Sequence, residues 1–498
     1  MLIAQVLSEY VRRGDFAIHQ TMKVVQDSLF NTSNSLYDLK LPLSNLSDPA
    51  ASSLSPQVSG LDQLLSFLDG QPSVKFLRLS YLDYTAMPRV RVIPVQHALA
   101  LLQNDGSLRV GISKGCLGML QNDKHTCGVT ATGEYRLCPI LSSIRPGPPK
   151  GFASLQCEFL EQDDYEVAIC PRSVLRRIVQ GAKAASLEFI LGFEIEVAFM
   201  SREKDSEFKC ASKSSGHAWN SGRALQGKAF LPVLEEIHDS LSDCGIQLEL
   251  FHAESCAGQY EFVLPPLPPL EAVDMLLHAR EIIYAVADRH SLRATLYPKP
   301  FSNQVGMASY VHISISSPKG EERDVYESFY AGIFGHLGAI IAFTYSNPTS
   351  YDRMVDGLCA GGPWVTWGTQ NRETALRKIA GSYWEVKVLE GLANPYLAMA
   401  AVIAAGTNGI VHRESLTWLD CTNDPAKLGA EERMGLGISE ELPKSLWDAA
   451  EMLLQDDTLS NILGNKAAER YHAVKLEELN LFKGMTSSGM KQWMIERY

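Results

Sequence analysis

The sequence predicts an α+β protein that folds into more than one domain and pairs most of its strands antiparallel. The 498 residues exceed the usual size of a single domain. Hydrophobic residues make up 46% of the chain and charged residues 20%, which is typical of a globular protein with an ample core. Strand-like and helical stretches alternate, but many neighbouring strand-like runs are joined by links too short for a parallel crossover.

The first third of the chain is expected to form two segments. Residues 1–60 combine an irregularly amphipathic helical stretch with a linker rich in Ser, Pro, Leu and Asn. Residues 61–168 contain apolar strand-like runs and a connection rich in Pro and Gly, which together predict a small mixed-sheet domain. The expected strands of this domain cover 74–81, 89–93, 108–112 and 152–159.

Residues 169–498 predict a larger domain. Pro171 precedes a helical pattern at 172–185, and proline is favoured in the first turn of a helix. The polar segment 203–222 predicts a loop, and most of 442–498 is predicted to be helical. Further helical patterns cover 224–243, 269–289, 323–346 and 395–413, and strand-like runs cover 189–200, 247–251, 260–264, 294–297 and 312–316.

Composition and hydropathy argue against a membrane, secreted or nucleic-acid-binding protein. The apolar runs 329–345 and 394–410 are shorter than the roughly 20 residues of a bilayer crossing, so they predict buried core helices. The net charge of −12 disfavours non-specific nucleic-acid binding. No signal-peptide pattern begins the chain, and the ten cysteines are scattered without a CxxC pair. We therefore expect a cytoplasmic protein with reduced thiols.

Paired carboxylates carry the strongest chemical signal. Glu194 and Glu196 are two apart in the apolar run 189–200, so both side chains should leave one face of a strand. Glutamates on strands are most often exposed surface charges, but uncompensated charges in such an apolar run would be costly. Carboxylate oxygens are the ligands that hard divalent ions prefer, so the pair predicts a metal site. Further candidate ligands are Glu254, Glu261 and Glu385.

Basic residues supply the complementary half of the predicted site. Three arginines taken alone would be interpreted as solvated surface charge, but beside a carboxylate cluster they favour phosphate or carboxylate binding. His252 and His312 alone would be interpreted as structural histidines. Their positions two residues before Glu254 and Ser314 favour a role at a nucleotide. The three arginines are Arg353, Arg372 and Arg377.

Several ordered motifs resemble those of the glutamine synthetase family. They include Ala294-Thr-Leu-Tyr-Pro-Lys-Pro300, Asn371-Arg372 and Ala393-Asn-Pro-Tyr-Leu397. The resemblance is to the type I class, closest to its FluG-like branch found in fungi, and it runs from about Leu61 to the C-terminus. It implies a β-grasp domain at 61–168 and a catalytic domain at 169–498 with a curved antiparallel sheet flanked by helices. It also implies a ring-shaped homo-oligomer.

The resemblance implies a ligase that uses ATP with Mg²⁺ or Mn²⁺ and acts on small molecules. The γ-phosphoryl group would move to the carboxylate of glutamate or a similar acid, and ammonia or an organic amine would displace phosphate. Carried over by motif, one metal would be held by Glu196, Glu254 and Glu261, and the second by Glu194 and Glu385. The nucleotide and its phosphoryl group would contact His252, His312, Ser314, Arg372 and Arg377, and the acid would contact Gly306, Arg353 and Lys387.

Four positions depart from the family pattern. Tyr310 replaces a histidine that binds the second metal, and a neutral phenol is a poor Mg²⁺ ligand, so we expect that metal to be held more weakly. Lys387 replaces an arginine that helps to grip the acid. Cys359 stands where glutamine-forming members carry a flap glutamate, and Lys114 stands where an aspartate helps to bind ammonium. The last two changes predict a weak reaction with ammonia.

Two other functions remain open on the sequence. Tyr310 and Lys387 would also suit a non-catalytic family member that regulates development or nitrogen metabolism by binding partners. A kinase acting on a small acid would use the same nucleotide site without an amine. Absence of nucleotide binding would favour the non-catalytic regulator over an enzyme. Release of ADP without an added amine would favour the kinase.

Overall fold

The computed structural model describes residues 59–498 except 203–206, 212–216, 227–229, 302–303 and 358–359. The chain divides into two units, residues 1–59 and residues 60–498, and the second unit is the subject of the following description. The predicted helical extension and linker in residues 1–60 lies almost entirely outside the described residues.

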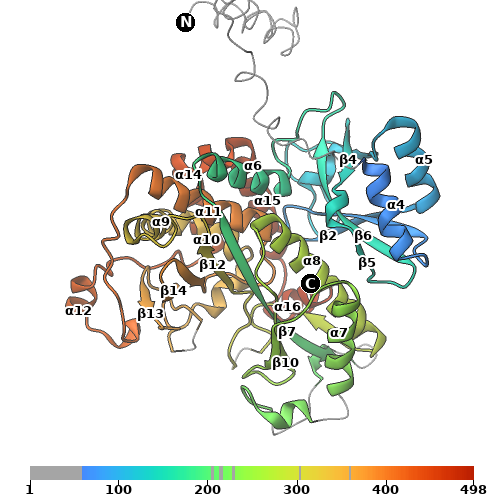
Figure 1. The fold of residues 1–498 in the computed structure, drawn as a ribbon. Coiled ribbons are helices and arrows are strands. Elements are labelled where there is room, and N and C mark those ends of the chain that lie inside the picture. Colours follow the sequence, from blue (N-terminus) through green and yellow to red (C-terminus); the bar gives the residue numbers. More distant parts are fainter. Residues whose placement is uncertain (1–58, 203–206, 212–216, 227–229, 302–303, 358–359) are drawn as a thin grey trace, which may run out of the picture. The chain divides into compact units, whose positions relative to one another are not determined.

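A six-stranded mixed sheet occupies the N-terminal part of the second unit (Figure 1). Its order is β2-β1-β6-β4-β3, with β5 (Arg145–Pro146) paired to β6, and only β1 and β6 are parallel. The helix α5 (Val95–Asp105) contacts β1 and β2. This mixed sheet confirms the prediction, although β4 was missed. The strands are β1 (Phe76–Leu82), β2 (Pro88–Pro94), β3 (Val110–Ser113), β4 (Glu134–Pro139) and β6 (Phe152–Leu160).

A nine-stranded sheet carries the rest of the fold. Its order is β13-β14-β15-β12-β7-β10-β9, with β8 and β11 also paired to β7. All pairs are antiparallel except β13 with β14, as the short predicted links suggested. The strands are β7 (Phe189–Ser201), β8 (Lys209–Cys210), β9 (Leu250–Ala253), β10 (Gln259–Val263), β11 (Arg293–Thr295), β12 (Val311–Ile315), β13 (Trp367–Thr369), β14 (Leu376–Ala380) and β15 (Tyr383–Val386).

The helices of the apolar runs form the core, as predicted. α9 (Arg323–Gly335), α10 (Leu337–Thr344) and α11 (Pro395–His412) bury most of their residues. Within the described residues, no helix is both long and apolar enough to cross a bilayer. Gly332 and Gly409 let α9 and α11 approach closely, because a Cβ on Gly332 would lie 2.8 Å from the Cα of Gly409.

Two helix predictions were wrong in extent. The pattern 323–346 is two helices rather than one, because the chain leaves helical geometry at His336, whose Nδ1 lies 2.6 Å from an Asp456 carboxylate oxygen. The pattern 224–243 is a 3₁₀ turn at Gly222–Leu225 followed by α7 (Leu231–Asp243). Pro232 sits in the first turn of α7, where the ring is tolerated.

The remaining helices follow the predicted pattern. α6 (Pro171–Ala184) begins at the expected proline, and α8 (Pro269–Arg289) has the expected bounds and packs on β7. Figure 1 shows α8 beside the long central strand β7. The C-terminal part is mostly helical, with α13 (Leu446–Gln455), α14 (Asp457–Leu463), α15 (Asn465–Phe482) and α16 (Ser487–Ile495). All nine described cysteines are free thiols.

His278 makes the stability of the fold depend on pH. It is buried on α8, its Nε2 lies 3.1 Å from the Pro146 carbonyl oxygen, and burial lowers its pKa to about 3. In the unfolded chain the pKa of this histidine is higher, about 6.5. The stability that depends on the neutral imidazole is therefore fully present above that pH and is lost as the pH falls below it. We expect the unfolding free energy of His278→Gln to fall less steeply than that of the wild type between pH 6 and 4. The two slopes should differ by up to about 1.4 kcal/mol per pH unit.

Urea unfolding at a series of pH values measures this slope. The exposed His412→Gln serves as the matched control and should keep the wild-type slope. Identical slopes for His278→Gln and the wild type would contradict the assignment of the buried neutral imidazole.

Candidate functional site

A cavity of about 1070 Å³ opens over one face of the nine-stranded sheet. Its walls come from β7, β9, β10 and β12, from the segment before β12, and from loops around Trp219 and Arg372. Most of the predicted site residues line it. They are Glu194, Glu196, His252, Glu254, Glu261, Gly306, His312, Ser314, Arg372, Arg377 and Lys387, together with Tyr310.

Strand register brings these residues onto one face. Glu261 on β10 pairs with Glu196 on β7 and with His252 on β9. Since directly paired residues point to the same side of a sheet, these three side chains converge. In the other half of the sheet, His312 on β12 pairs with Glu385 on β15. The predicted common face of the glutamates is therefore present.

The first acidic cluster consists of Glu196, Glu254 and Glu261 with His252. The imidazole of His252 lies between carboxylates, with its Nε2 3.4 Å from a Glu254 oxygen and its Nδ1 3.7 Å from a Glu261 oxygen. One ligand atom each from His252, Glu254 and Glu261 falls within 4.8 Å of the others. Glu196 is oriented by hydrogen bonds that its Oε2 accepts from the Gln259 side chain at 2.7 Å and from the Ala308 amide at 3.0 Å.

Burial and mutual repulsion hold protons on this cluster. Burial raises the pKa of Glu261 to about 10, and the charges of nearby carboxylates, first that of Glu194, add to the shift. Burial, followed by the charge of Glu254, raises the pKa of Glu196 to about 8. Such crowded acids are costly without a cation, which can displace their protons. The donor set of carboxylates and one imidazole therefore fits a divalent metal ion.

The second cluster consists of Glu194, His312 and Glu385. The Nε2 atom of His312 lies 3.0 Å from a Glu194 oxygen, and one ligand atom from each of the three lies within 4.8 Å of the others. His312, predicted at the nucleotide, is thus placed directly against a predicted metal ligand. Sequence spacing could not show this, because the contact depends on the pairing of β12 with β7 and β15.

Glu385 is already neutralised by this chain's own cations. Its two oxygens accept hydrogen bonds from Lys387 Nζ at 3.1 Å and from Arg377 Nη1 at 3.0 Å. Burial alone would raise its pKa, but Lys387, His312 and Arg377 outweigh burial and hold the pKa at about 2. With both oxygens engaged, Glu385 is a poor ligand for an added cation. The second cluster therefore fits a metal ion less well than the first.

Tyr310 separates Arg353 from the cavity. Arg353 is 1% exposed and does not line the cavity, so its contact with the acid stays a prediction. Its guanidinium donates to the phenol oxygens of Tyr345 at 3.2 Å and Tyr310 at 3.4 Å. Lys387 also contacts this ring, with Nζ 3.6 Å from the centre of Tyr310. Tyr310 therefore contacts two cationic side chains and lines the cavity.

Gly306, another residue predicted to contact the acid, stands where a side chain cannot fit. A Cβ at this position would lie 2.9 Å from the Pro298 carbonyl oxygen and 3.0 Å from the Cβ of Arg353. Gln259 and the amide of Ala308 were missed as supports of Glu196. The signal for Gln259 is its position two residues before Glu261, which places it on the same face of β10.

Two departures from the family pattern have different outcomes. Lys114 does not line the cavity, and its Nζ lies 2.6 Å from a Glu161 oxygen, so its positive charge is paired. The expected repulsion of ammonium by a free lysine charge is therefore not supported within this chain. Cys359, the position of the missing flap carboxylate, lies outside the described residues.

Comparisons with known proteins agree with the sequence motifs. A family model described as the catalytic domain of glutamine synthetase matches residues 168–498. Protein fluG of Emericella nidulans is 39% identical over 502 aligned positions, which cover 100% of this chain and 57% of that protein. The chain thus spans little more than half of the length of that relative. The alignment also includes residues 1–60, which the resemblance inferred from the motifs left out.

Two further comparisons concern a relative and a solved structure. Gamma-glutamylpolyamine synthetase GlnA3 of Streptomyces coelicolor is 30% identical over 437 positions, covering 83% of this chain and 91% of that protein. A solved GmaS/ADP complex superimposes with a TM-score of 0.74 at 22% identity, covering 87% of this chain and 99% of that one. The structural likeness extends beyond the residues matched by the family model.

Proposed function

Because this chain belongs to the glutamine synthetase family, we propose that it is an ATP-dependent ligase that joins a glutamate-like acid to an amine. The family as a whole uses ATP and a divalent metal. The single observation that carries the proposal is the gathering of acidic side chains in one large cavity, where Glu261 pairs with Glu196 and has ligand atoms within 4.8 Å of those of Glu254 and His252. A surface patch of carboxylates would not be buried, crowded and protonated in this way.

The proposed reaction has two steps. An oxygen of the acid's carboxylate attacks the γ-phosphorus of ATP, ADP leaves, and an acyl phosphate forms. The amine nitrogen then attacks the acyl carbon, phosphate leaves, and the nitrogen loses a proton. A metal ion at the first acidic cluster would neutralise charge on the phosphate oxygens. Glu196, Glu254, Glu261 and His252 would hold that ion, either Mg²⁺ or Mn²⁺.

The chain's own cations would supply the remaining positive charge. Arg372 is exposed on the cavity wall, and Arg377 lines the cavity beside Glu385, which supports the proposal that both contact phosphate oxygens. Ser314 also lines the cavity and offers a hydroxyl on the same face as His312. Lys387 is buried at the base and would contact the acid, whereas Arg353 could reach the acid only if Tyr310 moved.

We propose an organic amine rather than ammonia as the preferred nitrogen donor. The flap glutamate of glutamine-forming members is replaced by Cys359, so this position offers no carboxylate to take a proton from ammonium. The relative GlnA3, a gamma-glutamylpolyamine synthetase, supports an amine substrate within this family.

Release of ADP with glutamate and a panel of amines tests both proposals. We expect glutamate with ammonia to give a rate at least about tenfold below the best organic amine, a difference of about 1.4 kcal/mol in activation free energy. The panel contains ammonia, methylamine, ethanolamine, putrescine and spermidine, with an amine-free control. Full-rate glutamine formation would contradict the altered specificity, and amine-independent ADP release would favour the kinase.

A second candidate is a regulatory protein without turnover. Tyr310 favours it, because its phenol lines the cavity in contact with Lys387 and accepts a hydrogen bond from Arg353 in place of a metal ligand. Thermal melting with ATP and Mg²⁺ separates the candidates. A rise in melting temperature is required of the ligase, and no shift at millimolar ATP would favour the regulator. We also propose a ring-shaped homo-oligomer in the cytoplasm, which light scattering of the purified chain and fractionation of cells would test.

A further inference from the structure

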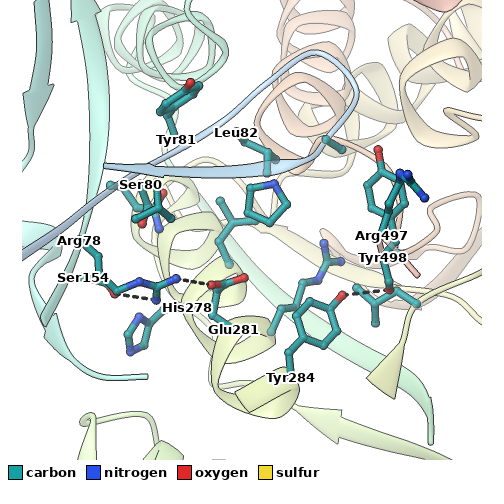
Figure 2. Close-up of a pocket in the computed structure, with 18 residues that line it drawn as sticks. Arg78, Ser80, Tyr81, Leu82, Ser154, His278, Glu281, Tyr284, Arg497 and Tyr498 are labelled. Atoms are coloured by element: carbon teal, nitrogen blue, oxygen red, sulfur yellow. Dashed lines mark hydrogen bonds and ion pairs between the residues drawn. The ribbon is translucent and has the colours of Figure 1, made fainter. Parts of the chain in front are cut away.

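A second cavity lies between the six-stranded sheet and helix α8 (Figure 2). It shares no lining residue with the cavity of the acidic clusters. Its volume is about 60 Å³, which is room for roughly four to six water-sized probes and too little for a nucleotide. Part of its wall is apolar, with Leu82, Val90, Leu277 and Leu296.

Arg280 on α8 gives this cavity an uncompensated positive charge. It lines the cavity and is only 7% exposed. Its Nη2 donates to the hydroxyl of Ser309 at 2.9 Å, while its Nε makes no hydrogen bond with any described residue. No carboxylate in the described part of the chain forms an ion pair with it. Burial lowers its pKa, because nothing nearby compensates fully for the lost hydration.

The carboxylates around Arg280 are committed to other groups. Glu281 also lines the cavity, but its oxygen lies 2.8 Å from Arg78 Nη2, as the dashed line in Figure 2 marks. Glu390 acts on Arg280 only through its charge, since its oxygens accept from Ser346, from Ser350 and from the Leu392 amide. Burying a guanidinium without a counter-ion costs free energy, so buried arginines in folded proteins are usually paired with an anion.

Two further arginines extend the positive potential of the cavity. Arg78 and Arg497 both line it, and Figure 2 shows them on opposite sides of the space. Arg497 Nη1 donates to the Trp493 carbonyl at 3.1 Å, so part of its fork stays available. His278, the remaining basic group of the lining, is neutral because burial lowers its pKa to about 3. Arg78 is paired with Glu281, and Arg497 lies 3.9 Å from a Glu496 oxygen, so among these three cations of the lining only Arg280 has no carboxylate partner within the described residues.

We propose that this cavity binds a small oxyanion, a carboxylate or phosphate of roughly acetate to phosphate size, on the Arg280 guanidinium. Planar guanidinium groups pair with such anions through two parallel hydrogen bonds. The apolar part of the wall would accommodate a short aliphatic tail, which a carboxylate can carry and inorganic phosphate cannot. The site does not depend on the proposed ligase reaction.

The site is also coupled to the first acidic cluster through Ser309. The hydroxyl that accepts from Arg280 donates to the main-chain oxygen of Glu194 at 3.1 Å. The preceding residue, Ala308, donates its amide to Glu196. An anion that draws the guanidinium toward itself weakens the hydrogen bond to Ser309, and with it the support of the strand that carries both glutamates.

Melting of the whole chain in sodium acetate and in sodium phosphate tests the site, with sodium chloride holding the ionic strength constant. We expect a saturable rise in melting temperature with at least one of the two anions for the wild type. Arg280→Met should lose this rise, and in chloride alone it should melt no lower than the wild type, because an unpaired buried charge is removed. Arg223→Met is the matched control, because Arg223 is exposed and lines neither cavity, and it should keep the rise.

The outcomes separate the anion sources and decide the proposal. A rise with acetate alone assigns a carboxylate, and a rise with phosphate alone assigns a phosphate. An equal response of Arg280→Met and the wild type, or no response of the wild type, would overturn the site. Should Arg280→Met fail to fold, crystals of the wild type soaked in selenate decide the question. An anomalous peak within hydrogen-bond distance of Arg280 would support the site, and the absence of a peak there would overturn it.

Binding of Mn²⁺ tests the coupling. We expect the effective anion to change the Mn²⁺ affinity of the wild type at least twofold and to leave that of Arg280→Met unchanged. Equal affinities with and without the anion in the wild type would overturn the coupling through Ser309.

Discussion

Replacing Glu196 by alanine is expected to abolish the binding of Mn²⁺ at the first acidic cluster and, with it, all metal-dependent ADP formation. Glu196 faces Glu261 across the β7–β10 pair and is oriented by Gln259 and by the Ala308 amide. Loss of a partner outside the ligand sphere already costs a metal site about 10–100-fold in affinity. Loss of a ligand itself should therefore weaken Mn²⁺ binding by more than about 100-fold. Titration followed by the electron paramagnetic resonance of free Mn²⁺ measures this.

The stability of the variant distinguishes a lost ligand from a damaged fold. Glu196 has a raised pKa because burial and the charge of Glu254 disfavour its carboxylate. Removing it relieves that cost, so the metal-free variant should melt at or above the wild-type temperature. Glu249→Ala is the matched control, since Glu249 lines the same cavity but is exposed and belongs to neither cluster. Retained Mn²⁺ affinity in Glu196→Ala would rule out the proposed ligand set.

Strand β7 and its glutamates could be predicted because their signal is local. Alternation over two residues in an apolar run determines both the strand and the common face of Glu194 and Glu196. Long buried helices such as α8 and α11 were equally clear, because their apolar residues persist over 18 or more positions. In these elements local pattern and tertiary burial agree, so the sequence alone is sufficient.

The strands β13, β14 and β15 could not be predicted in this way. They are three to five residues long, and their site face carries Arg377 and Glu385, which as sequence are indistinguishable from a polar loop. Their charges are buried only because each meets an opposite charge on a neighbouring strand or residue. These pairs are close in the sequence, but β15 joins the sheet only through its pairing with β12, which lies far from it along the chain.

Long-range packing also determined which residues reach the cavity. Arg353 matches a family position that holds the acid, yet in the structure its guanidinium donates to the Tyr310 phenol and does not line the cavity. The sequence alone gives no partner for the charge of Lys114, whereas in the structure Lys114 forms an ion pair with Glu161. The residue type indicates what chemistry is possible at a position, and the neighbours decide whether that chemistry is available.

Replacing Tyr310 by histidine is expected to create a second Mn²⁺ site at Glu194, His312 and Glu385. The phenol of Tyr310 offers no anionic oxygen, because burial raises its pKa well above the ordinary value. An imidazole would offer a neutral nitrogen ligand near two carboxylates. Lys387 would still compete for Glu385, since its Nζ lies 3.1 Å from one oxygen. We therefore expect the single variant to bind the second ion weakly. Tyr310→His combined with Lys387→Met, which removes the competing cation, should bind it roughly 10–100-fold more tightly.

Stoichiometry by equilibrium dialysis of Mn²⁺ tests this directly, with one ion per chain expected for the wild type and two for the double variant. Tyr310→Phe is the control, because it keeps the ring between Arg353 and Lys387 and adds no ligand. A second ion already bound by the wild type at comparable affinity would show that the pairing of Glu385 with Lys387 and Arg377 yields readily to a metal. In that case Tyr310 would not weaken binding of the second ion. Its phenol would have to act on the substrates instead, because the cavity would already hold two metal ions to neutralise the charge that develops in the reaction.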